Sequence, residues 1–375
     1  MRRRRLGRLL AELRPASVPV APQPADRRAI PIIDISKSDR SHIAETLGAS
    51  FEATGFAVVV GAGERLAAAT SGLSAAGRSF FAQPEELKWK VHIDPDLMEH
   101  PDGNPGYLEP GHISVASLLG DHSRPPDAVE CIYFKDLHYY ESGCTGPTLE
   151  SKPAKLAPKW PSEAFRTTTL QYFRECHALW QNLVSLAELA LALPAGFFAP
   201  YFGQAMSTSL QIRNYLDVET LEAQLPFGAH TDSGMFTVVN TQEPGLQVDP
   251  QLTGEWLDVP TVPGGYVVNV GRCLARWTND RWLAAVHRVN SSSSNGGPTK
   301  QTTAFFSFPD LDATIECLPG CSSKEMPARY LPFSAREFME QRVKLHTMGE
   351  PQETIDSNVW DDPRRASKPH HPLPN

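Results

Sequence analysis

The sequence predicts a mainly β protein with helices (an α+β fold), in which a sandwich or jelly roll of two packed sheets follows a helical N-terminal region. Short strand-like segments recur between turns after residue 202, whereas the longest helical pattern lies before it. Hydrophobic residues make up 41% of the chain, which is enough to build a core.

The first 29 residues differ from the rest of the chain. They begin with Met-Arg-Arg-Arg-Arg-Leu, and acidic residues are rare before Asp26. This basic character is shared by organelle transit peptides, which are also rich in serine. Because the serine enrichment is absent, we favour a disordered basic tail and a cytoplasmic protein, with a transit peptide as the alternative.

The folded part is expected to start at Ala29. Patterns of apolar residues predict four elements before residue 89: strands over 29–35 and 56–60, and helices over 41–54 and 64–88. Pro84 is expected to break the last helix. Residues 89–163 are rich in Pro, Gly, His and Asp and predict a long irregular segment. Such long loops often cover a functional site.

One long helix separates this segment from the strand-rich part. Apolar residues at three- and four-residue steps predict it over 162–193. Seven strands are then predicted, over 208–215, 235–240, 245–248, 255–259, 266–270, 284–289 and 302–308. The chain therefore divides into an N-terminal tail (1–29), a helical and mixed region (30–200), a jelly-roll core (201–345) and a C-terminal tail (346–375).

Composition excludes several classes of protein. The chain has 35 basic and 43 acidic residues, a net charge of −8, so a nucleic-acid partner is not expected. The most apolar run, 183–202, contains Glu188 and Pro194 and predicts a buried helix, not a membrane span. Six scattered cysteines without a Cys-x-x-Cys motif predict reduced thiols in an intracellular protein, although Cys317 and Cys321 are close enough in sequence to pair.

A His-x-Asp pair, His230 and Asp232, is the strongest candidate for a metal site. On a β-strand residues i and i+2 point to the same face, so an imidazole and a carboxylate would converge there. Two imidazoles and one carboxylate are the ligand set of non-haem Fe(II) oxygenases. Taken alone, the pair is a weak indication, because the chain contains twelve histidines.

The third ligand must come from elsewhere in the chain. The later candidates are Asp258, Asp280, His287 and His346. His287 lies in the strand-like phrase Ala-Ala-Val-His-Arg-Val-Asn, 287 − 230 = 57 residues after His230. That distance leaves room for four or five strands, so a closed double sheet can bring the two histidines together.

Ten short sequence motifs occur in this chain in the same order as in a known protein family. They include Ile30-Pro-Ile-Ile-Asp-Ile, Phe227-Gly-Ala-His-Thr-Asp-Ser-Gly, Pro263-Gly-Gly-Tyr-Val-Val-Asn-Val-Gly and His287-Arg-Val. From Ile30 to about Phe338 the chain resembles the 2-oxoglutarate- and Fe(II)-dependent dioxygenases of the isopenicillin N synthase-like superfamily. The resemblance implies a double-stranded β-helix (jelly-roll) core with a helical N-terminal support. It also implies that His230, Asp232 and His287 bind iron.

The cosubstrate site departs from the family's pattern. Members usually carry Arg-x-Ser before a Phe-Phe strand, and this arginine holds the far carboxylate of 2-oxoglutarate; here the phrase is Lys300-Gln-Thr302. Lysine keeps the charge but not the planar fork. Tyr215 fits the family's tyrosine partner. Arg213, two residues earlier where relatives often have Asn, is a candidate to compensate for Lys300, or else forms a structural ion pair.

The expected function is oxidation of a C–H bond in a small metabolite, by hydroxylation, desaturation or ring closure, in specialised metabolism. The resemblance implies Fe(II), with 2-oxoglutarate and O₂ as cosubstrates and ascorbate as a reductant. The partners expected are a small-molecule substrate and no nucleic acid or membrane, and the chain is expected to be a monomer. Two alternatives stay open: an Fe(II) oxidase that needs no 2-oxoglutarate, of the isopenicillin N synthase type, and a non-catalytic metal-binding β-sandwich protein.

Overall fold

A computed structural model describes residues 29–93, 106–115, 125–135, 159–203, 207–216, 225–290 and 300–346. Nearly all of the two predicted tails therefore lies outside the described residues. Among the described residues, no helix is long and apolar enough to cross a membrane.

Helices precede, separate and follow the strands. They are α2 (Arg40–Ala53), α3 (Glu64–Phe81), α4 (Glu85–Lys88), α7 (Glu163–Ala190), α8 (Arg272–Trp277) and α9 (Ala335–His346), with 3-10 turns η1 (Trp89–Val91) and η5 (Ala199–Tyr201). Side chains cap three helices at their first turn: Asp39 accepts from the backbone of His42, Ser162 from that of Phe165 and Ser334 from that of Glu337. The predicted break at Pro84 is confirmed, since α3 ends before it and α4 starts after it.

Two sheets form the β part of the fold. The large sheet has the order β1-β2-β10-β7-β12-β5-β4-β3 and the small sheet the order β6-β11-β8-β9. The large-sheet strands are β1 (Ile32–Asp34), β2 (Phe56–Val60), β3 (Gly106–Leu108), β4 (Val129–Lys135), β5 (Ser207–Tyr215), β7 (Phe236–Thr241), β10 (Tyr266–Val270) and β12 (Lys300–Phe308). The small-sheet strands are β6 (Phe227–His230), β8 (Leu246–Asp249), β9 (Leu257–Asp258) and β11 (Val286–Val289), and β13 (Thr314–Ile315) pairs with β14 (Phe333–Ser334).

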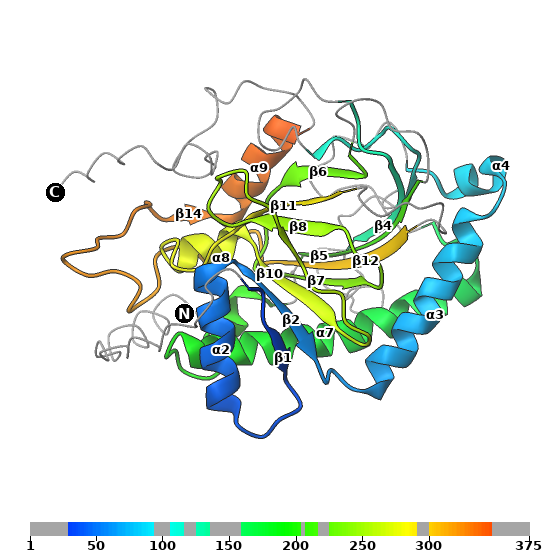
Figure 1. Cartoon of the computed structure of the whole chain (residues 1–375). Coiled ribbons are helices and arrows are strands. Elements are labelled where there is room, and N and C mark those ends of the chain that lie inside the picture. The colour runs from blue at the N-terminus through cyan, green and yellow to red at the C-terminus, as the bar shows by residue number, and fades with distance from the viewer. Residues whose placement is uncertain are drawn as a thin grey trace.

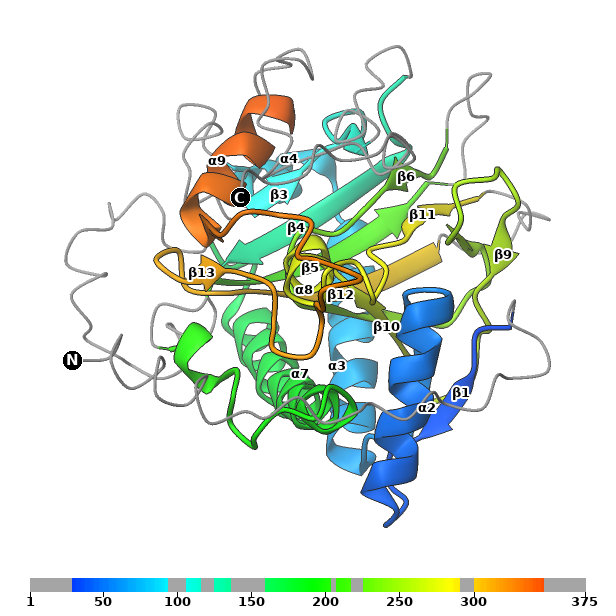
Figure 2. The same ribbon diagram turned by 90° about the vertical axis from the view of Figure 1, so that its left-hand side faces the viewer.

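Helices cover one face of the large sheet, and the small sheet lies over the other (Figures 1 and 2). On the helical side, the ring of Phe173 in α7 lies 5.7 Å from that of Phe305 in β12. The next residue, Phe306, points to the opposite face because side chains alternate along a strand, and it lines a pocket between the sheets. The jelly-roll core and its helical support are therefore as the sequence predicts.

One expectation about the order of elements is wrong. Residues 89–163 are not wholly irregular, because β3 and β4 extend the large sheet at one edge. The two early strands that the sequence predicts, over 29–35 and 56–60, are present as β1 and β2, and they join the other edge through the β2–β10 pair. Neither α8 nor α9 was predicted, and the five described cysteines, Cys317 and Cys321 among them, are free.

Candidate iron site

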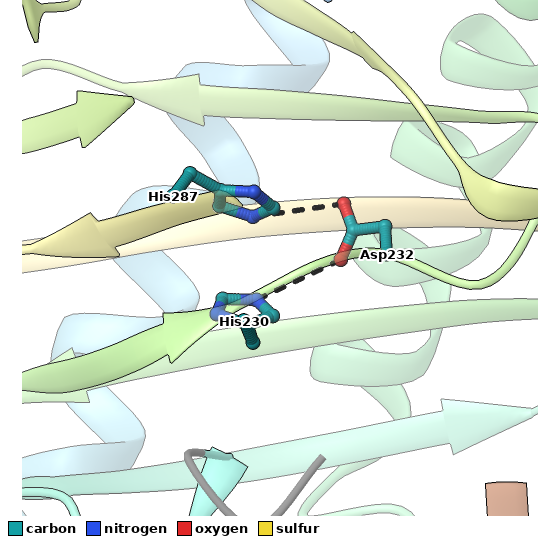
Figure 3. A group of neighbouring side chains, drawn as sticks. All are labelled: His230, Asp232 and His287. Carbon is teal, nitrogen blue, oxygen red and sulfur yellow. Dashed lines mark ion pairs between the residues drawn. The ribbon is translucent and has the colours of Figure 1, made fainter. Parts of the chain in front are cut away.

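Strand pairing brings the two histidines together. His230 ends β6 and is the direct cross-strand partner of His287 in β11, so both side chains lie on the same face of the small sheet. Their ring centroids are 4.2 Å apart (Figure 3). Between them in sequence lie β7, β8, β9 and β10, which matches the predicted distance of four or five strands.

Asp232 reaches the histidines from a loop. β6 ends at His230, so the expectation that pleating places Asp232 is wrong. The loop is instead held by backbone hydrogen bonds: Arg272 N donates to the Asp232 carbonyl at 2.8 Å, and Met235 N donates to the Ser307 carbonyl at 3.0 Å. These bonds connect the loop to α8 and β12, and they turn the carboxylate back toward both rings (Figure 3).

The donor atoms of the three side chains converge. One ligand atom from each of His230, Asp232 and His287 lies within 4.8 Å of the others, and all three residues are buried. The Nε2 atom of His230 is 3.7 Å from Asp232 Oδ1, and that of His287 is 3.8 Å from Asp232 Oδ2. Two nitrogens and one oxygen around a single point suit a divalent iron ion and leave further positions open.

Hydrogen bonds fix which imidazole nitrogen faces the metal position. His230 Nδ1 donates to the Gly228 carbonyl at 2.9 Å and His287 Nδ1 to the Ala285 carbonyl at 3.1 Å. A carbonyl only accepts, so in both rings the proton sits on Nδ1 and the lone pair of Nε2 points toward Asp232. Burial, with the nearby His287, lowers the pKa of His230 to about 3, which keeps its ring in the neutral form that a metal requires.

The carboxylate of Asp232 is held by two buried side chains. Its Oδ2 accepts hydrogen bonds from Thr237 Oγ1 at 2.6 Å and from Asn269 Nδ2 at 2.7 Å. Burial acts to raise the pKa of Asp232, but the histidines and these two donors outweigh it, so the pKa is lowered. Neither donor was predicted, although Asn269 is conspicuous in the sequence as the one polar residue of Tyr-Val-Val-Asn-Val.

A pocket opens beside this centre. It has about 600 Å³ of empty space, part of it open to solvent. Apolar side chains form part of its wall: Phe56, Phe227, Val239, Leu246, Val289, Ala304 and Phe306. The structure brings all seven predicted site residues to this pocket, because Arg213, Tyr215, Lys300 and Thr302 line it together with His230, Asp232 and His287.

The four candidate cosubstrate residues lie on β5 and β12. Lys300 pairs with Tyr215 and Thr302 pairs with Arg213 across these strands. The Tyr215 hydroxyl is 3.2 Å from Thr302 Oγ1, and Lys300 Nζ donates to the Pro244 carbonyl at 3.1 Å. Arg213 is 8% exposed, and its guanidinium lies 4.1 Å from the ring centroid of Phe227. It is therefore a buried cation in the pocket wall, which excludes an ion pair at the surface and leaves the structural ion pair as the alternative role.

A jelly roll that carries two imidazoles and a carboxylate beside an open pocket has the architecture of the non-haem iron oxygenases. Comparison with known proteins gives the particular family. Two family models match the chain. The model of the 2OG-Fe(II) oxygenase superfamily matches residues 207–309, and the model described as "non-haem dioxygenase in morphine synthesis N-terminal" matches residues 30–163. The chain belongs to the 2-oxoglutarate- and Fe(II)-dependent dioxygenases.

Individual relatives agree with this family. The chain is 28% identical to a 2-oxoglutarate-Fe(II) type oxidoreductase, hxnY, of Emericella nidulans, over 72% of this chain and 75% of that protein. It is 27% identical to the validamycin A dioxygenase of Streptomyces hygroscopicus subsp. limoneus, over 78% and 79%. The fold matches a full-length Neurospora crassa protein, solved in complex with alpha-KG (2-oxoglutarate) and thymine, with a TM-score of 0.70, 24% identity and coverage of 85% and 98%.

The protein is therefore an oxidoreductase that uses Fe(II) and 2-oxoglutarate to oxidise a small molecule. This outcome favours the 2-oxoglutarate-dependent interpretation over the two alternatives, an oxidase without this cosubstrate and a non-catalytic β-sandwich protein. The donor set and the ring orientations fit Fe(II).

Proposed function

We propose that His230, Asp232 and His287 hold the Fe(II) of a dioxygenase that oxidises a C–H bond of a small metabolite. The convergence of these three donors in a pocket that also contains Lys300 and Thr302 is the observation that carries the proposal. Enzymes of specialised metabolism occur among the relatives, such as the validamycin A dioxygenase, and we place this chain in the same setting.

The residues of the pocket have separate tasks. Bound Fe(II) would supply oxidising chemistry for the substrate, with O₂ as the oxidant and with 2-oxoglutarate converted to succinate and CO₂. Thr237 and Asn269 hold the Asp232 carboxylate in one orientation, so that it need not rotate when the metal ion binds. The hydroxyls of Tyr215 and Thr302 donate to the far carboxylate of 2-oxoglutarate, and the apolar wall keeps water away from the reacting centre.

In our proposal, the positive charges of Lys300 and Arg213 together balance the far carboxylate of 2-oxoglutarate. Lys300 provides a single ammonium, which holds a carboxylate with less geometric specificity than a guanidinium. Arg213 is close enough to His230 to lower its pKa. The described hydrogen bonds of Arg213 use Nε and Nη2, both to Gln211 Oε1 at 3.0 and 2.7 Å, and its place in the pocket wall allows the rest of the guanidinium to support Lys300.

Calorimetric titration of 2-oxoglutarate into the Fe(II)-loaded protein under argon tests these roles. We expect Lys300→Met to weaken 2-oxoglutarate binding by about tenfold to a hundredfold, because a charge-assisted contact is lost. Arg213→Met should weaken it less, and the double variant more than either. Fe(II) affinity should stay unchanged in Lys300→Met. Unchanged 2-oxoglutarate affinity in both single variants would show that the cosubstrate is held elsewhere.

Product analysis tests the reaction itself. A metabolite extract incubated with the protein, Fe(II), ascorbate and 2-oxoglutarate should lose one compound and gain an oxidised one, with one succinate formed for each. An Asp232→Ala variant is the control for background chemistry. Substrate oxidation without succinate would favour the isopenicillin N synthase type of reaction instead.

We also propose that the protein acts as a monomer in the cytoplasm. The five free cysteines in the described part of the chain support a reducing compartment. Light scattering coupled to gel filtration tests the oligomeric state, and a fluorescent fusion of the whole chain, with and without residues 1–29, tests the location. A mass of two chains would contradict the monomer, and import into an organelle would contradict the cytoplasmic location.

A further inference from the structure

The strand that carries His230, β6, lies at the edge of the small sheet. Among the described residues, the order β6-β11-β8-β9 gives it one neighbouring strand, β11. The pairing of β6 with β11 is irregular, because Phe227 and His230 are three positions apart whereas their partners in β11 are only two positions apart. The extra residue forms a bulge, which disrupts the ladder of hydrogen bonds locally. The backbone just before His230 therefore needs a further partner to hold it.

The side chain of Asp127 supplies this partner. Asp127 lies two residues before β4 and is 3% exposed. Its Oδ1 accepts a hydrogen bond from Gly228 N at 2.8 Å, and its Oδ2 accepts one from Val115 N at 3.1 Å. Burial raises the pKa of Asp127 to about 6, while these two donors act to lower it. The carboxylate is therefore ionised at neutral pH, and each of its oxygens accepts from one backbone N–H.

Asp127 is itself held at the edge of the large sheet. Its backbone N–H donates to the Ile113 carbonyl at 2.8 Å, and that of the next residue, Ala128, donates to the Leu225 carbonyl at 3.1 Å. The Ala128 carbonyl accepts from Leu216 N at 3.2 Å, where the ladder between β4 and β5 begins. The Asp127 carboxylate therefore has a fixed position relative to the large sheet, and it connects the edge of the small sheet to that position.

Gly228 links this carboxylate to the metal centre. Its N–H donates to Asp127, and its carbonyl accepts from His230 Nδ1 at 2.9 Å. The second bond fixes the ring so that Nε2 faces the metal position. A displacement of Gly228 therefore turns this imidazole. The corresponding bond of His287, to the Ala285 carbonyl, lies in a strand that is paired on both sides.

We propose that Asp127 is a positioning residue for His230, because it holds the edge of β6 through Gly228 and so sets the orientation of this candidate iron ligand. The inference rests on the proposed iron site. It also connects the segment 106–115 to the metal centre, since Val115 N occupies the other oxygen of the same carboxylate. Asp127 acts through Gly228 and not as a ligand, so its replacement should weaken metal binding without removing a donor atom.

Asp127→Asn tests this role with almost no change in side-chain size. An amide offers one oxygen and one NH₂ group, so one of the two backbone N–H donors loses its acceptor. Anaerobic competition with a chromophoric chelator at neutral pH should show Fe(II) binding that is about tenfold weaker, the lower end of the loss expected when an outer partner of a metal ligand is removed.

Glu188→Gln is the matched control. Glu188 is a buried carboxylate at the end of α7, on the helical side of the large sheet. Its two oxygens likewise accept from one backbone N–H each, from Gly196 at 2.8 Å and from Phe198 at 3.0 Å. Glu188→Gln should lower the free energy of unfolding but leave the Fe(II) affinity unchanged.

Proton NMR of the Co(II)-loaded chain distinguishes positioning from a general loss of stability. Co(II) shifts the exchangeable Nδ1 protons of histidine ligands far outside their usual range, so the native chain should show one such signal from His230 and one from His287. In Asp127→Asn one signal should move or exchange faster with water, while the other, whose proton is bonded to the Ala285 carbonyl, should stay in place. Glu188→Gln should leave both signals unchanged.

Unchanged Fe(II) affinity with two unchanged signals in Asp127→Asn would overturn the proposal, and so would equal effects of Asp127→Asn and Glu188→Gln. Hydrogen exchange in the native chain provides a second test if Asp127→Asn does not fold. The Gly228 amide should exchange more slowly with Zn(II) bound, whereas the Phe198 amide should not change. Equal exchange of the Gly228 amide with and without metal would contradict the role of Asp127. Failure of the native chain to bind Fe(II) or Co(II) would instead reject the iron site itself.

Discussion

Asp232 receives two buried hydrogen bonds on one oxygen, and at the scale of residues this explains its orientation. Asn269→Leu keeps the side-chain volume but removes one donor. We expect Fe(II) affinity to fall by about tenfold to a hundredfold, as is usual when the outer partner of a metal ligand is lost. Competition with a chromophoric chelator under argon measures it. The control is Asn214→Leu, since buried Asn214 donates to Glu130 outside the site. It should reduce stability but not Fe(II) affinity.

The buried imidazole of His230 makes the stability of the metal-free chain depend on pH. Its pKa is lowered from 6.5 to about 3 in the folded state, so the unfolded chain binds more protons between these values. The contribution of His230 is present above about pH 6.5 and is lost as pH falls toward 3, by up to ~1.4 kcal/mol per pH unit. Burial raises the pKa of Asp127 to about 6, which acts in the opposite direction.

A comparison with His230→Gln isolates this histidine, because the contribution of Asp127 cancels. Urea denaturation between pH 7.5 and pH 4 should show the native chain losing free energy of unfolding relative to His230→Gln as the pH falls. A difference between the two proteins that does not change with pH would mean that His230 is not held neutral by the fold.

The three candidate metal ligands could be proposed from the sequence because their spacing and the phrases around them are local. His230, Asp232 and His287 lie in short motifs that can be recognised without any knowledge of the fold. The side chains that donate to Asp232 could not be predicted in this way, because Thr237 and Asn269 come close to it only when β7 and β10 pair.

At the scale of elements, Asp232 lies on a loop after β6 and not on the strand that the His-x-Asp spacing suggested. The loop passes so close to β12 that a Cβ atom on Gly234 would lie 1.9 Å from the Ser307 carbonyl oxygen. Gly271 is equally constrained, since its Cβ would lie 2.3 Å from the Gly234 carbonyl oxygen. Close backbone packing beneath the candidate metal ligands therefore requires the glycine that ends His-Thr-Asp-Ser-Gly.

Gly234→Ala should displace this loop and with it Asp232. We expect a loss of several kcal/mol of stability, because the clash is with backbone atoms that cannot rotate away, together with weaker Fe(II) binding. Urea denaturation and the chelator assay measure the two effects. Gly72→Ala in α3 is the control: its new Cβ meets nothing closer than Thr168 Cγ2 at 3.4 Å, so it should be neutral or stabilising by about 0.5–1 kcal/mol. Equal behaviour of the two variants would contradict the role of Gly234.

Helices and strands with an unbroken apolar pattern could be predicted from the sequence. The strand β4 could not, and its sequence shows why. Glu130 interrupts its apolar sequence Val-Glu-Cys-Ile-Tyr-Phe, which obscures the strand. In the fold this buried carboxylate accepts from Lys88 at 2.7 Å, Tyr107 at 2.6 Å and Asn214 at 2.9 Å. These partners come from three separate elements, and only their assembly makes a charged residue acceptable in a buried strand.

At the scale of the whole molecule, the two sheets carry different parts of the proposed site. His230 and His287 belong to the small sheet, whereas Tyr215, Lys300 and Thr302 belong to the large sheet. A ligand that touches both ends therefore connects the sheets across the jelly roll. Because such a ligand binds the folded state alone, it adds about 2.7 kcal/mol to the free energy of unfolding at a hundred times its Kd.

Thermal unfolding under argon should reveal this connection as a dependence of one ligand on the other. We expect Fe(II) alone to raise Tm by a few degrees, 2-oxoglutarate alone to raise it little, and both together to raise it by more than the sum. The keto-acid end of 2-oxoglutarate needs the metal, so Asp232→Ala should lose both increases. Lys300→Met should keep the increase with Fe(II) and lose most of the further increase with 2-oxoglutarate. A shift with 2-oxoglutarate that is as large without metal as with it would contradict a site that spans the two sheets.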